Sequence, residues 1–192
     1  PITASGTSSD YDPPVLTVPT WYRRKAVSGM CETISNILNL TVLPSISNNV
    51  IIPDKPEVCF NTVPGQIAGT PLTGGTGNTQ TWAWQNSTNS GASWADISGA
   101  NQQSYTPAAS LTQQTWYRRI IKSGPFDCCI DTSAVISIDT LTLPTAQITT
   151  ISDTTVCSGT PVRLKVHLTG AKTWVLTYLE GSTPVTVNDI PS

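Results

Sequence analysis

The chain has 192 residues, a formal net charge of -2 and only 11% charged residues, while 20 serines and 30 threonines make it rich in hydroxyl groups. It contains no basic run, so its charge pattern is not that of a protein that binds nucleic acid or an anionic membrane surface. It also lacks a run of 18 apolar residues and a signal-peptide pattern at its first residues. We therefore expect no nucleic-acid partner and no membrane insertion in this segment.

A five-residue sequence occurs twice in the chain. The run Thr-Trp-Tyr-Arg-Arg at 20–24 recurs at 115–119, which is 95 residues further on. The segment around Cys59 likewise resembles the one around Cys157, and these two cysteines are 98 residues apart. A period of this length is that of a whole domain. We expect the back half of one unit at 1–44, a complete unit at 45–144 and the front part of another at 145–192, so that the chain is cut mid-domain at both ends.

Short β-strands are predicted along these units. Segments rich in β-branched or aromatic residues are separated by clusters of Gly, Pro, Asn and Ser, which is typical of strands and turns. The predicted strands are 58–63, 81–85, 116–122, 134–143, 162–168 and 174–179. The segment 86–93 is expected to be a hairpin turn. No segment of ten or more residues shows a capped helical period. A unit of about 100 residues with such strands predicts an all-β chain of tandem immunoglobulin-like β-sandwich domains, joined by short linkers that contain Pro44 and Pro144.

The repeated aromatic strand predicts which side chains are buried. We expect Trp84 to lie in the core, and Tyr117 and its counterpart Tyr22 to point inward. Because neighbouring residues of a strand face opposite ways, Trp116 and Arg118 then share the outer face. An arginine beside an exposed tryptophan can stack on its ring, which contributes about 0.5–1 kcal/mol at a surface.

The five cysteines favour disulfides over a metal site. Cys59 has no second cysteine two to four residues away, and the single histidine, His167, lies in another unit, so a zinc site is the poorer interpretation. Cys59 and the late pair Cys128 and Cys129 are spaced like partners across one domain, while the other two cysteines would pair outside the chain. Buried reduced thiols remain the alternative.

No group of residues in the sequence is typical of catalysis. His167 is on the polar side of an alternating strand without an acidic neighbour, and the aspartates are scattered mostly in turns, where their local hydrogen bonding is expected. A calcium ion at a domain junction, held by Asp54 or Asp153, is a weaker alternative, because the only Asp-x-Asp run, Asp10 to Asp12, lies away from both junctions and lacks a continuing ligand series. We expect no enzyme activity, no catalytic residue, no cofactor and no metal.

The sequence resembles a known family along the segments 82–88, 91–100, 104–107 and 115–119. They resemble the Ig-like repeats of giant secreted adhesins of the Bacteroidetes, a family that includes the SprB-like gliding-motility adhesins, and 157–190 resembles a sister repeat type. The resemblance implies a filament on the outer membrane, exported by the type IX system, with a disulfide from Cys59 to Cys128 or Cys129. It also implies O-glycosylation after aspartate, for which Thr140 and Thr154 are the candidates.

The expected function is that of a structural stalk segment in such an adhesin, serving attachment or gliding motility. Its expected partners are neighbouring repeats, the type IX secretion and surface-attachment machinery, and surface polysaccharide. The alternative is a carbohydrate-binding module of a secreted polysaccharide-degrading enzyme, or an adhesive repeat that itself binds sugars. That alternative requires an exposed aromatic row, for which the candidates are Trp82, Trp94, Trp116 and Trp174.

Overall fold

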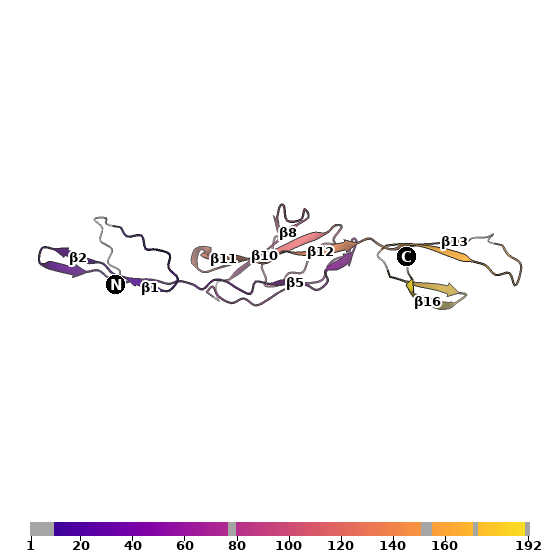
Figure 1. Cartoon of the computed structure of the whole chain (residues 1–192), viewed down its shortest axis with the longest axis horizontal. Helices are drawn as coiled ribbons and strands as arrows, with labels where there is room; N and C mark the ends of the chain where they lie inside the picture. Colours follow the sequence, from indigo (N-terminus) through magenta and orange to yellow (C-terminus); the bar gives the residue numbers. More distant parts are fainter. Residues whose placement is uncertain (1–9, 77–79, 151–154, 171–172, 191–192) are drawn as a thin grey trace.

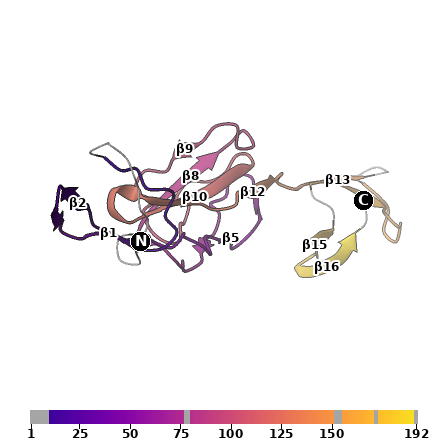
Figure 2. The ribbon, with the colours of Figure 1, turned by 60° about the vertical axis from the view of Figure 1, so that its left-hand side comes forward.

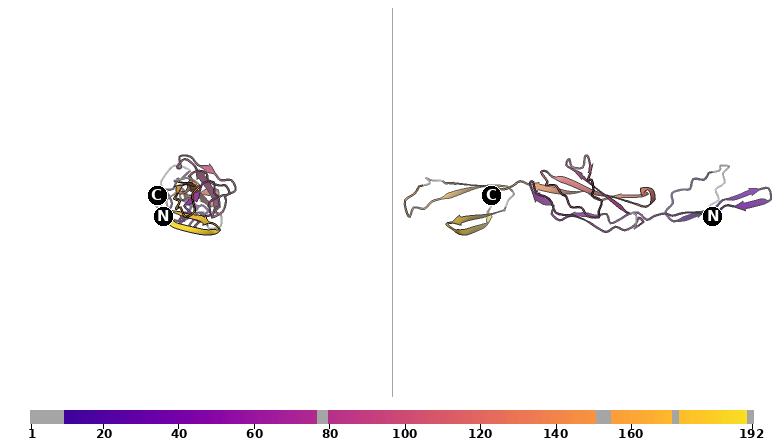
Figure 3. Two further views of the ribbon diagram at one scale, coloured as in Figure 1. Left: turned by 90° about the vertical axis from the view of Figure 1, so that its right-hand side faces the viewer. Right: turned by 180° about the vertical axis from the view of Figure 1, so that it is seen from behind.

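The computed structural model describes residues 10–76, 80–150, 155–170 and 173–190. This part of the chain contains sixteen β-strands and one short 3-10 helix, which confirms the prediction of an all-β protein. Three groups of strands follow one another along the long axis in chain order (Figure 1), and end-on they overlap within one narrow outline (Figure 3). We call them the N-terminal, central and C-terminal units. None of the described helices has the length and apolar character of a membrane span.

The N-terminal unit consists of two antiparallel strand pairs. Strand β1 (Thr20–Tyr22) pairs with β4 (Leu38–Leu40), and β2 (Lys25–Ser28) pairs with β3 (Cys31–Ile34). The β2–β3 hairpin points away from the central unit (Figure 1).

The central unit is built on a six-stranded sheet with the strand order β6-β12-β10-β8-β9, in which β11 also pairs with β10. Its elements are β6 (Glu57–Cys59), β8 (Thr81–Ser87), β9 (Ala95–Asp96), β10 (Thr115–Ser123), the 3-10 turn η1 (Pro125–Asp127), β11 (Cys129–Thr132) and β12 (Ile136–Leu141). All pairings are antiparallel except that of β6 with β12, which is parallel. Strand β10 is long enough to pair with β12 at its beginning and with β11 at its end.

A second layer covers the inner face of this sheet. Strands β5 (Ile51–Pro53) and β7 (Ile67–Gly69) form an antiparallel pair. Apolar side chains from both layers make one buried cluster, which contains Ile51, Val58, Ile67, Trp84, Leu111, Tyr117 and Ile138. The central unit is therefore sandwich-like, with its core between the two layers. The ribbon of β5 is seen beside those of β8, β10 and β12 in Figure 2.

Strand β10 shows how the sequence sets the layers. Its residues alternate strictly between buried and half-buried from Thr115 to Ser123. Tyr117 is 2% exposed and Trp84 on β8 is 1% exposed, so both are core residues as predicted. Trp116 and Arg118 are half-buried on the opposite face, which was also predicted.

The turn between β8 and β9 confirms the hairpin expected at 86–93. The Ser87 hydroxyl accepts hydrogen bonds from the backbone N–H groups of Asn89 and Gly91, at 3.3 and 3.0 Å. The Asn89 carboxamide oxygen accepts from the backbone N–H of Ser93, at 3.0 Å. Short side chains thus satisfy the backbone of the turn, as is typical of Ser and Asn there.

The C-terminal unit again consists of two separate pairs. Strand β13 (Thr145–Thr150) pairs with β14 (Leu164–Thr169), and β15 (Trp174–Glu180) pairs with β16 (Thr183–Ile190). Several strands are shorter than predicted or shifted along the sequence. In these places the residues typical of a strand continue beyond the last residue in regular pairing with a neighbouring strand. The predicted strand 58–63, for example, forms a regular ladder only as Glu57–Cys59, and beyond it Thr62 makes an isolated antiparallel bridge with Leu111.

The two terminal units expose apolar residues of the kind that the central unit buries. Val27 is 64% exposed in β2, and Leu179 is 70% exposed in β15. Tyr22, which we expected to point inward like Tyr117, is only half-buried. A two-stranded pair is marginally stable in water because it has no second layer to cover its apolar face. The described parts of the terminal units therefore consist of separate two-stranded sheets with exposed apolar residues.

Candidate functional site

The buried charged group of the central unit is the guanidinium of Arg119, on the inner face of β10. The side chain is 0% exposed. Its Nε donates to the Asn49 Oδ1 at 2.9 Å, its Nη1 to the Gln103 carbonyl at 2.6 Å and its Nη2 to the Thr70 carbonyl at 3.3 Å. These acceptors lie before β5, after β9 and after β7, so one arginine connects three segments to the sheet.

Burial also shifts the acid–base equilibrium of this arginine. Desolvation lowers the pKa of the Arg119 guanidinium from its usual value, because burial penalises the charged form, and the nearby negative charge of Asp131 opposes this shift. An arginine nevertheless keeps its charge in proteins. Since the guanidinium faces protein acceptors and no solvent, Arg119 is a structural link.

The sequence contained a signal for this buried arginine that the prediction missed. If Tyr117 points inward, alternation places Arg119, two residues later, on the same inward face. Arginine is almost never fully buried unless it is paired, so its position should have indicated acceptors nearby. Those acceptors come from segments far away in sequence, and no local pattern identifies them.

A polar and aromatic cluster covers the outer face of the same sheet. The Arg118 guanidinium lies 4.3 Å from the centre of the Trp94 ring, just before β9. The Arg118 Nε donates to the Gln85 Oε1 at 2.7 Å, and the Gln85 Nε2 donates to the Asp96 Oδ1 at 2.7 Å. Arg118 thus stacks on Trp94 across the sheet, and the sequence could not have shown this partner because 24 residues separate the two. We call these four residues the Trp94 cluster.

The four tryptophans that we proposed as a sugar-binding row do not gather on one surface. Trp116 and Trp94 belong to the outer face, whereas Trp82 pairs with the buried Ile121 and so belongs to the inner face. Trp174 is in the C-terminal unit, and all four are half-buried. Of these four tryptophans, Trp94 is the one with an arginine stacked on its ring, and that arginine is hydrogen-bonded to Gln85.

The structure contains no disulfide between Cys59 and Cys128 or Cys129, since all five cysteines are unbonded. Cys59 lies beyond the Thr115 end of β10, whereas Cys129 pairs with Ser123 at the other end. Eight residue steps of extended strand span about 26 Å, and a disulfide needs Cα atoms within about 7 Å. Spacing in the sequence does not say at which end of the sandwich a cysteine lies.

The vicinal pair has its own geometry. The Cys128 Sγ lies 4.0 Å from the Cys129 Sγ, so the two thiols are in contact without a bond. Burial, followed by the hydrogen bond and charge of Cys128, raises the pKa of the Cys129 thiol. A raised pKa keeps this thiol protonated and unreactive at neutral pH.

The remaining candidate residues are dispersed. His167 is exposed on β14 opposite Gln147. The described residues contain no cluster of three or more His, Cys, Asp or Glu side chains that would hold a metal ion. Asp54 lies against Gly65, and Asp153 lies outside the described residues.

Of the two candidate glycosylation sites, Thr140 and Thr154, the structure describes only Thr140. Thr140 is half-buried on β12, two residues after the buried Ile138, and so shares its inward side. Thr154 lies outside the described residues.

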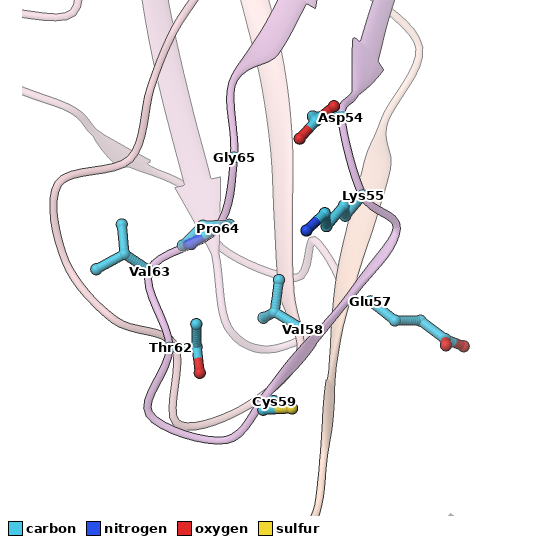
Figure 4. Close-up of a pocket in the computed structure, with 9 residues that line it drawn as sticks. All are labelled: Asp54, Lys55, Glu57, Val58, Cys59, Thr62, Val63, Pro64 and Gly65. Carbon is cyan, nitrogen blue, oxygen red and sulfur yellow. The ribbon is translucent and has the colours of Figure 1, made fainter. Parts of the chain in front are cut away.

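A surface pocket of about 390 Å³ lies between the loops that flank β6 (Figure 4). It is lined by Asp54, Lys55, Glu57, Val58, Cys59, Thr62, Val63, Pro64 and Gly65. The Glu57 side chain points away from the others (Figure 4). A thiol nucleophile is activated by an adjacent base or by a lowered pKa, and the lining contains no histidine. Cys59 therefore has no histidine beside it in this pocket.

The described structure defines an elongated all-β protein made of successive strand groups. Residues 48–142, from just before β5 to just after β12, match a family described as Domain of unknown function (DUF8696). No curated protein and no solved structure matches the chain.

Proposed function

We propose that the chain is a stalk segment of a large secreted, surface-attached filamentous adhesin that serves attachment or gliding motility. The observation that carries the proposal is the repeated strand signature in units placed end to end (Figure 3). In this proposal each unit is an immunoglobulin-like sandwich, completed by its neighbours in the chain. Export by the type IX system follows from the resemblance of the repeats to Bacteroidetes adhesins.

Contacts at the two linkers between units, at Pro44 and Pro144, support a rod-like arrangement of the units. At the first junction the Pro44 carbonyl accepts from the backbone N–H of Gly75 at 2.9 Å. At the second, Gly170 approaches Pro144 so closely that an added Cβ would lie 3.0 Å from the Pro144 Cα. A proline with fixed φ and a packed linker both restrict bending. Such units would hold a distal binding tip away from the cell.

Small-angle X-ray scattering of the purified chain tests the rod. A compact protein of this length has a radius of gyration of about 16 Å, and we expect a value well above that. A value near 16 Å would contradict the end-to-end arrangement. Antibodies against the chain test the location, since they should label intact cells of the source organism and lose this labelling when type IX secretion is disabled.

A second candidate function rests on the Trp94 cluster. An aromatic ring flanked by Arg118, Gln85 and Asp96 has the chemistry that stacks on and hydrogen-bonds a sugar. In this case the chain would be a carbohydrate-binding module or a sugar-binding adhesive repeat. The test is titration with bacterial and algal polysaccharides, followed by tryptophan fluorescence. Binding should be lost in Trp94→Ala and kept in Trp116→Ala, and equal binding by both variants would exclude the cluster.

A further inference from the structure

The two kinds of cysteine in a unit lie at its opposite ends. Cys59 is at the end where the chain leaves the central unit, and its Cα partner is Leu141, close to the following linker. Cys128 is at the end where the chain enters, because it follows the tip of the β10–β11 hairpin. The repeat gives the N-terminal unit the same hairpin, in which Cys31 pairs with Ser28 as Cys129, the residue next to Cys128, pairs with Ser123. In an array, the exit-side cysteine of one unit therefore faces the hairpin cysteine of the next.

The first junction shows how close these positions are. Thr20 pairs with Leu40 as Thr115 pairs with Ile138, so counting three residues on makes Leu43 the counterpart of Leu141. A cysteine of the Cys59 type in the N-terminal unit would then be paired with Leu43. The position of a Cβ on Gly124 lies 2.8 Å from the Leu43 Cδ1 and 2.6 Å from the Cys128 Sγ. Leu43 and the Cys128 thiol are therefore neighbours across this glycine.

The second junction shows the matching space from the other side. A cavity of about 430 Å³ lies beside Cys59 and is lined by both units, including Leu141, Pro144, Thr173 and Trp174. Thr173 is in the β14–β15 loop, which corresponds to the β7–β8 loop of the central unit. That earlier loop holds the β10–β11 hairpin, because the backbone N–H of Thr76 donates to the Ser123 Oγ at 2.9 Å. The cavity thus lies where the next hairpin would pack.

We propose that Cys59 forms a disulfide with the hairpin cysteine of the following repeat, at the position of Cys31 and Cys128, so that covalent links run between repeats and not within them. The inference rests on the tandem organisation in the proposed function. Both thiols lose a proton, one S–S bond forms, and the two electrons reduce a disulfide-bearing oxidant to two thiols by exchange. Cys157 would be linked in the same way to the repeat after its own.

The test uses two full chains fused tail to head, with Ser192 of the first copy followed by Pro1 of the second. Because 192 residues are close to two repeats of 95–98 residues, the fusion keeps the phase of the array. Residues 145–192 of the first copy and 1–44 of the second then complete one unit. The protein is oxidised with oxidised glutathione, digested without reduction and mapped by mass spectrometry. The unfused chain, treated identically, is the control.

We expect most of the first copy's Cys59 to be linked to the second copy's Cys31, and the first copy's Cys157 to the second copy's Cys128. Cys59→Ser should remove the first link and leave the second. In the unfused chain Cys59 should carry only glutathione. A link from Cys59 to Cys128 or Cys129 of the same copy would overturn the proposal.

Limited proteolysis of the fusion separates this proposal from the proposed function. If the completed unit becomes protease-resistant but Cys59 is not linked to Cys31, the inter-repeat disulfide is wrong and the tandem array stands. If the completed unit is digested as readily as the ends of the unfused chain, the tandem array fails and the disulfide fails with it.

Discussion

Replacing Arg119 by methionine tests the structural role of the buried guanidinium. Methionine fills a similar volume with an unbranched chain, so the cavity left behind is small. The change removes three hydrogen bonds and leaves Asn49 and two backbone carbonyls without their donor. Each buried acceptor left unpaired costs about 1–3 kcal/mol, and breaking a buried charged contact typically costs about 3–5 kcal/mol in total. A domain has only about 5–15 kcal/mol to lose.

The neighbouring arginine is the matched control. Arg118→Met removes a stacking contact with Trp94 and one hydrogen bond to Gln85 on the outer face. Its expected cost is about 1 kcal/mol or less, because the group is partly solvated. The two variants change the same residue type at adjacent positions of one strand, so their difference isolates burial.

Urea unfolding followed by tryptophan fluorescence measures both costs. With a slope of about 2 kcal/mol per molar urea, Arg119→Met should lower the midpoint by about 2 M and Arg118→Met by about 0.5 M or less. Hydrogen exchange of the β10 amides confirms that the transition belongs to the central unit. Equal midpoints for the two variants would refute the argument from burial.

Three further predictions follow from the central unit. Gly69→Ala should lower the free energy of unfolding by more than about 3 kcal/mol, because the added Cβ would lie 1.9 Å from the Arg119 Nη1. Gly99→Ala, whose Cβ would meet nothing within 4 Å, should lower it by only about 1 kcal/mol through backbone strain. Thermal melts measure both effects. Desolvation, followed by the charge of Tyr105, raises the pKa of Tyr117 to about 12. Because an unfolded tyrosine ionises near pH 10, stability should fall as pH rises from about 10 to 12, and tyrosinate absorbance should show one tyrosine ionising only upon unfolding. Trp84→Ala should destabilise the unit by about 3–5 kcal/mol and Trp94→Ala by about 1 kcal/mol or less, as measured by urea unfolding monitored by circular dichroism.

The features that depend on local pattern could be predicted from the sequence. The all-β class, the inward Tyr117, the core Trp84 and the turn after β8 each follow from alternation, turn residues or the repeat. Tyr22 shows the limit of this reasoning, because it has the same neighbours as Tyr117 but lacks a second layer in the described structure.

The features that depend on contacts distant in sequence could not be predicted. The short strands β5 and β7 have only three residues each, too few for a period to be visible. Arg118 stacks on Trp94 because the β8–β9 hairpin brings that ring over the sheet. The residues next to Arg118 in the sequence do not indicate this contact. The position of Cys59 could not be predicted for a related reason, since the parallel register of β6 and β12 places it at the exit end, and no spacing rule contains that register.

The parallel pairing of β6 and β12 determines how the central unit would carry a pulling force. The chain enters through β5 and β6 and leaves through β12, and the two strands run in the same direction side by side. Tension on the two ends would slide β6 and β12 along each other in shear. The hydrogen bonds from Asp139 N–H to the Pro56 carbonyl and from Phe60 N–H to the Leu141 carbonyl, both 2.8 Å, would then share the load at once and would not open one by one as in a zipper.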